Sequence, residues 1–145
     1  METPKCKVYI AYNALAPYSV ENAVLLDAAQ YILDMTYTET LREEEGGTYG
    51  AGVVANCYDK PKERERLLVV FDTNVEQAPR LIELVREGID GILKNGITDD
   101  QLSKTVENLK KNIPEKHISN SYWYKVLKIN AEDGYDYDAK YQAAV

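Results

Sequence analysis

The sequence has few residues that could serve metal or disulfide chemistry. Its 145 residues include one histidine, His117, and two cysteines, Cys6 and Cys57. A catalytic zinc site takes three protein ligands, so the lone histidine is expected to be a surface or helix-start residue. The cysteines are too few and too far apart for a metal knuckle. Free buried thiols are expected, and a disulfide between neighbouring strands is the less favoured alternative.

Other absences exclude whole classes of protein. The sequence has no apolar run long enough for a membrane span and no apolar signal region near its start. A net charge of −7 argues against a nucleic-acid surface, which needs a basic field. The basic run at 60–66 is interleaved with glutamate and is interpreted as a solvated turn. No Gly-x-Ser-x-Gly, phosphate loop or dinucleotide fingerprint occurs. The sequence does not distinguish a bacterial cytoplasmic from a periplasmic location.

The overall composition is typical of a soluble globular domain. Hydrophobic residues make up 45% and charged residues 28%, which is ordinary for such a chain. The length suits one domain with a real core. We expect residues 1–145 to form a single domain cut from a larger protein, in which 132–145 begin an incomplete last helix.

Hydrophobic periodicity predicts an α+β fold, with an antiparallel or mixed sheet layered against helices in the order β-α-α-β-β-α-α-α. Strands are expected at 7–13, 48–58 and 67–71, the last of them central and covered on both faces. Helices are expected at 20–35, 36–45, about 74–94, 98 to about 112, and 119–131. Capping boxes at Asn74/Gln77 and Thr98/Gln101 should open two of the helices, and Pro114 should end one. Gly50 and Gly52 should permit close approach of a helix or another backbone.

The functional interpretation depends on one stretch, Leu41-Arg42-Glu43-Glu44-Glu45-Gly46-Gly47-Thr48-Tyr49-Gly50. It joins a charged, helix-favouring run to a strand-like run, and its glycine pair can take the positive φ that ends a helix. Folding there would bring the Arg42 guanidinium and the Tyr49 phenol to the same edge. Spacing alone favours a plainer interpretation, in which Arg42 offsets the negative helix end and Tyr49 lies in the core.

This motif resembles the C-terminal half of pitrilysin/insulinase-type zinc metallopeptidases, through the pattern Leu-Arg-Glu-x-x-Gly-x-x-Tyr-Gly. The similarity runs from about Val8 to Tyr135 and includes the element order, Asn120-x-x-Trp123 and Gly134. It implies a metallopeptidase half-domain of the pitrilysin or mitochondrial processing peptidase type.

The resemblance also implies that the zinc site and the substrate contacts of this chain lie on different halves of the whole protein. The zinc site of that family, a His-x-x-Glu-His helix with a distal Glu, is missing from this sequence. We therefore expect no metal or cofactor in this chain, and zinc in a missing N-terminal half on the same or a separate chain. Arg42 and Tyr49 match the family's positions that hold substrate carbonyls and the oxyanion.

The implied function is a substrate-binding domain of a peptide-hydrolysing zinc metallopeptidase, inactive alone. Its expected partners are the zinc-bearing half and a peptide substrate, with no nucleic acid. Two alternatives stay open. One is a non-catalytic scaffold subunit of the same fold. The other is a stand-alone α+β module that binds a small ligand or assembles through its sheet edge.

Overall fold

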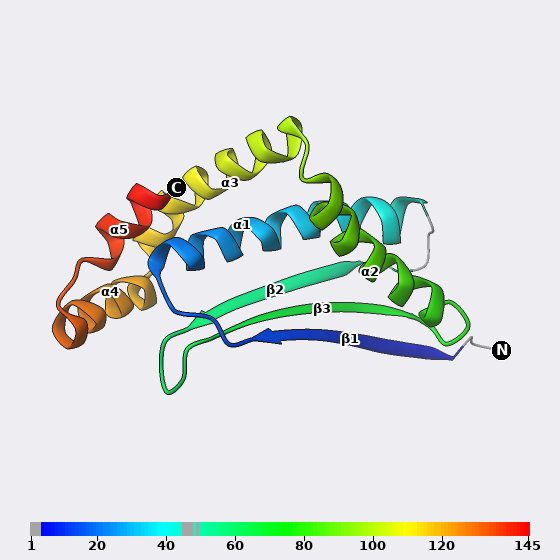
Figure 1. The fold of residues 1–145 in the computed structure, drawn as a ribbon, viewed down its shortest axis with the longest axis horizontal. Helices are drawn as coiled ribbons and strands as arrows, with labels where there is room; N and C mark the ends of the chain where they lie inside the picture. Colours follow the sequence, from blue (N-terminus) through cyan, green and yellow to red (C-terminus); the bar gives the residue numbers. More distant parts are fainter. Residues whose placement is uncertain (1–3, 45–47, 49) are drawn as a thin grey trace.

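The computed structural model describes residues 4–44, 48 and 50–145, with the backbone alone at 42–44. Its element order confirms the predicted α+β class (Figure 1). The elements are β1 (Lys5–Ala14), α1 (Val20–Tyr37), η1 (Thr38–Glu44), β2 (Ala51–Tyr58), β3 (Arg64–Asn74), α2 (Ala78–Asn95), α3 (Asp99–Ile118), α4 (Asn120–Asp133) and α5 (Tyr137–Ala144). No helix in these described ranges is long and apolar enough to cross a membrane.

The sheet is antiparallel throughout, in the order β1-β3-β2. The apolar run at 67–71 lies in the central strand, as predicted, and its Val69 and Phe71 are buried against the helices. The prediction that this strand is covered on both faces is wrong. The helices of the described chain lie on one side of the sheet (Figure 1), and Tyr9 and Val54 on the other face are 63% and 48% exposed.

Helix α1 is long enough to join two hydrophobic cores. Its second half packs on the sheet and α2, where Leu33 and Tyr37 belong to the first core. Its first half packs against the C-terminal helices, where Val20 and Val24 belong to the second core with residues of α3, α4 and α5. The helical layer at the C-terminal end therefore reaches the sheet largely through α1.

Helix α3 begins as predicted and ends later than predicted. The Thr98 hydroxyl accepts from the Gln101 N–H, and the Gln101 side chain accepts from the Thr98 N–H, which completes the capping box. Pro114 does not end the helix, which runs on to Ile118. Contacts of the last turn offset the missing proline N–H, since Lys116 and His117 bond to α5.

The Asn74/Gln77 pair forms one of the two capping-box hydrogen bonds, its second contact joining the two side chains instead, and it does not start a helix. Asn74 Oδ1 accepts from the Gln77 N–H at 2.8 Å within a turn, and α2 begins at Ala78. Pro79 explains the delay, because proline fits only the first helical turn.

The predicted close approach at Gly50 and Gly52 is wrong. A Cβ at either glycine would meet nothing within 4 Å among the described atoms.

Candidate functional site

The motif lies where α1 runs into η1. The predicted helix at 36–45 is confirmed as far as Glu44. From Thr38 on it is a π-helix, a form that often occurs at functional sites. Leu41 is fully buried in the sheet core, which fixes the backbone directly before Arg42. The Arg42 side chain, Gly46, Gly47 and Tyr49 lie outside the described residues.

On the other side of the motif, Thr48 is fixed by its own hydroxyl. Thr48 is 8% exposed. Its Oγ1 donates to the Gly50 carbonyl at 2.9 Å and accepts from the Gly50 N–H at 3.2 Å. Such local bonds between a threonine side chain and the backbone two residues on are common where a strand begins or a chain turns, and here they hold Thr48 and Gly50 directly before β2.

Two side chains of α1 bond directly to strand β2. Asp34 Oδ1 accepts from the Val53 N–H at 2.7 Å, and Gln30 Oε1 accepts from the Ala55 N–H at 2.8 Å. Since β2 is an edge strand, these N–H groups have no strand partner, and an open edge invites further pairing. Burial raises the pKa of Asp34, although the hydrogen bond from Val53 works to lower it.

The described residues do not fit a zinc site. His117 is not at a helix start but in the last turn of α3. Its Nε2 lies 2.8 Å from Asp138 Oδ1, and its ring packs against Tyr122 and Trp123. In the part of the chain that the structure describes, no three His, Cys, Asp or Glu side chains gather around a common point.

The cysteines lie at opposite ends of the sheet. Cys6 is level with Thr73 on β3 and Cys57 with Glu65. This offset of eight residues corresponds to about 26 Å at the usual strand rise. Both thiols are free and partly buried, and the alternative of a disulfide between them is wrong.

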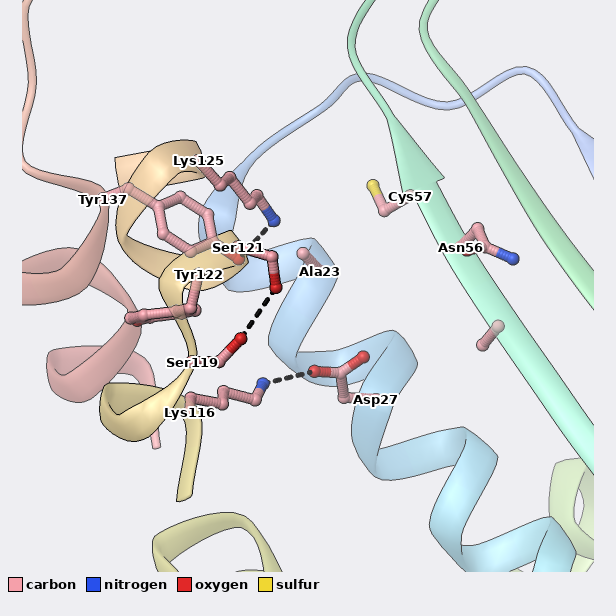
Figure 2. Close-up of a pocket in the computed structure, with 11 residues that line it drawn as sticks. Ala23, Asp27, Asn56, Cys57, Lys116, Ser119, Ser121, Tyr122, Lys125 and Tyr137 are labelled. Atoms are coloured by element: carbon pink, nitrogen blue, oxygen red, sulfur yellow. Dashed lines mark hydrogen bonds and ion pairs between the residues drawn. The ribbon is translucent and has the colours of Figure 1, made fainter. Parts of the chain in front are cut away.

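A second group of polar side chains lines a cleft of about 430 Å³ between β2, α1 and the C-terminal helices (Figure 2). Lys116 and Lys125 project into it, with the Ser119 and Ser121 hydroxyls between them in this view. The sequence analysis missed this cleft. Its residues come from several elements and form no local motif, so no periodicity or spacing could have indicated it.

Comparisons with known proteins bear on the family and the fold of the chain. A family model described as the peptidase M16 inactive domain matches residues 1–109. No protein with a curated description is significantly similar to the chain in sequence.

Solved structures share the fold at low sequence identity. A mutant of the ferredoxin protease FusC, in complex with Arabidopsis ferredoxin, matches with a TM-score of 0.78 at 16% identity, over 98% of this chain and 16% of that chain. The periplasmic protease PqqL from Escherichia coli matches with a TM-score of 0.73 at 19% identity, over 98% of this chain and 16% of that chain. A peptidase M16 inactive domain from Pseudomonas fluorescens matches with a TM-score of 0.62 at 18% identity, over 76% of this chain and 27% of that chain. The chain thus spans about 16% of the length of the two proteases.

Proposed function

We propose, because the chain belongs to the peptidase M16 inactive-domain family, that it forms the substrate-binding wall of a larger zinc peptidase. The metal would be carried by a separate zinc-bearing half, on the same or another chain, since the residues described here do not fit one. The substrate class is a peptide. Two of the structures that share the fold belong to proteases, and in both the matched region is a small part of the whole.

Within this wall, Arg42 and Tyr49 are the residues proposed to touch the substrate. The observation that carries the proposal is that described neighbours of both residues are held in place. Leu41 is fully buried immediately before Arg42, and the Thr48 hydroxyl bonds to the backbone of Gly50. Such support is what a preorganised site requires, because catalytic groups must be held in place before the reaction.

The two side chains suit different parts of peptide hydrolysis. A phenol O–H can donate a hydrogen bond to the negative charge that develops on the scissile carbonyl oxygen, and losing one such donor costs about 100- to 1000-fold in rate. A guanidinium presents a rigid fork of donors that can hold peptide carbonyls in place. Tyr49 is therefore assigned to the oxyanion and Arg42 to substrate positioning.

The test is turnover of a peptide by the chain assembled with its zinc-bearing half. Tyr49→Phe should lower kcat about 100- to 1000-fold and leave assembly intact. Tyr124→Phe is the matched control, because Tyr124 lies on α4 and is 70% exposed. Equal turnover by wild type and Tyr49→Phe would remove Tyr49 from the mechanism.

The second candidate is a non-catalytic scaffold subunit of the same fold. The family's description as an inactive domain fits this candidate as well as the first. The two candidates differ in the partner. A partner half that carries His-x-x-Glu-His supports the peptidase, and a natural assembly whose other half lacks that motif supports the scaffold.

A further inference from the structure

The cleft between the C-terminal helices and the sheet is built from parts of the chain far apart in sequence. Its walls come from α1, the end of β2, the end of α3, and α4 with the start of α5 (Figure 2). Its volume of about 430 Å³ falls within the usual range for small-molecule sites. It lies near Cys57 at the end of β2, whereas the motif precedes Ala51 at the start of that strand.

Two ammonium groups face this cleft, and they are partnered unequally. Lys116 Nζ donates to the Tyr141 hydroxyl at 2.6 Å and lies 3.5 Å from Asp27 Oδ2. Lys125 Nζ donates to the Tyr137 hydroxyl at 2.9 Å and lies over the Tyr137 ring. No carboxylate of the described chain lies within ion-pair distance of Lys125.

The local charge is therefore unlike that of the chain as a whole. The protein carries a net charge of −7, yet the cleft is lined by two lysines and one aspartate. Partial removal from water lowers the pKa of Lys125 and repulsion from Lys116 lowers it further, while attraction to Asp27 and Asp59 works to raise it. A bound anion would also favour the charged form of Lys125.

Hydroxyl groups complete the lining. Ser119 Oγ and Ser121 Oγ lie 2.7 Å apart and bond to each other, between the two lysines as drawn in Figure 2. Each hydroxyl can rotate and donate to a ligand instead. Ammonium and hydroxyl donors around one space are the usual surroundings of phosphate and carboxylate oxygens.

We propose that this cleft binds a small oxyanion, a phosphate or a carboxylate group, between Lys116 and Lys125, with Ser119 and Ser121 as additional donors. The bound anion would join α3 and α4 across the cleft. The site goes beyond the proposed peptidase role and does not depend on it.

The experiment is calorimetric titration of the chain at low chloride, with inorganic phosphate in one arm and N-acetylglycine in the other. Saturable one-to-one binding of either probe is expected. Binding of phosphate alone identifies the ligand as a phosphate, and binding of N-acetylglycine alone identifies it as a carboxylate. Lys125→Met should weaken binding about tenfold or more, the cost of one charged hydrogen bond. Lys128→Met is the matched control, since Lys128 is exposed on the same helix and does not line the cleft.

A second pair of variants keeps the test decisive if Lys125→Met fails to fold. Ser121→Asp places a carboxylate in the cleft and should abolish binding, whereas Ser121→Asn, of similar size and neutral, should retain it. Ser121 is exposed, so both substitutions should fold. The proposal is overturned if neither probe binds wild type saturably, if Lys128→Met weakens binding as much as Lys125→Met, or if Ser121→Asp binds as tightly as Ser121→Asn.

Discussion

The ring of Tyr37 occupies the space that a side chain on Gly88 would need. A Cβ at Gly88 would lie 2.8 Å from Tyr37 Cε1, and Tyr37 cannot move away easily because its hydroxyl donates to the Val85 carbonyl at 2.8 Å. The close approach of α1 and α2 therefore requires glycine. Gly88→Ala should destabilise the chain, because about 1–3 kcal/mol of overpacking outweighs the gain of about 1 kcal/mol in helix propensity.

A second glycine of α2 supplies the control for urea unfolding. A Cβ at Gly91 would meet nothing within 4 Å in the described structure, so Gly91→Ala should raise the free energy of unfolding by about 1 kcal/mol. The two substitutions should thus have opposite signs. Stabilisation by both would show that α1 and α2 are not packed as described.

Asp34 should make folding less favourable as the pH rises. Burial raises the pKa of Asp34 above its unfolded value, so the folded state keeps this proton over a range in which the unfolded state has lost it. The contribution of Asp34 to the free energy of unfolding is most favourable below the unfolded pKa, which is about 4. It declines as the pH rises from there to the folded pKa, and does not change above the folded pKa. Asp34→Asn, with its amide oxygen accepting from Val53, should be more stable than wild type at pH 7, and the difference should shrink in acid.

Urea unfolding at several pH values checks this prediction, with Gln30→Ala as a pH-independent comparison. Gln30 makes the equivalent contact to Ala55 without a titrating group, and its loss should cost about 1 kcal/mol at every pH. An Asp34→Asn variant that is less stable than wild type at pH 7 would contradict the raised pKa of Asp34 in the folded state.

Asp138 should behave in the opposite way. Burial works to raise its pKa, but hydrogen bonds from Tyr122, His117 and Gln142 outweigh burial and hold the pKa below its ordinary value. This stabilisation is full above the unfolded pKa, about 4, and is lost as the pH falls through the depressed folded pKa. Asp138→Asn should therefore cost about 1.5–3 kcal/mol at pH 7.

Acid titration of the melting temperature separates this role from simple packing. The gap between wild type and Asp138→Asn should close as the pH falls below 4. A gap that stays constant into acid would mean that the carboxylate charge contributes nothing.

Most of the fold could be predicted because it is encoded locally. Alternation marked the strands at 7–13 and 48–58, a continuous apolar run marked the strand at 67–71, and the Thr98/Gln101 box marked a helix start that the structure confirms. The strand order and register depend on contacts between distant segments, so a single sequence does not specify them.

The errors have the same origin in tertiary contacts. The local signal of Pro114 was overridden by the bonds of Lys116 and His117 to α5. The motif could be predicted because its residues are contiguous, whereas Lys116 and Lys125 meet at the cleft only after four helices and a strand have packed.

The most direct test of the account is to separate transition-state binding from substrate binding at Tyr49. In the assembly with the zinc-bearing half, we would measure the affinity of a phosphinic peptide, which mimics the tetrahedral transition state, and of the matching uncleaved peptide. Tyr49→Phe is predicted to weaken the binding of the phosphinic peptide about 100- to 1000-fold and to leave the affinity for the plain peptide nearly unchanged. Equal affinities of wild type and Tyr49→Phe for the phosphinic peptide would contradict it.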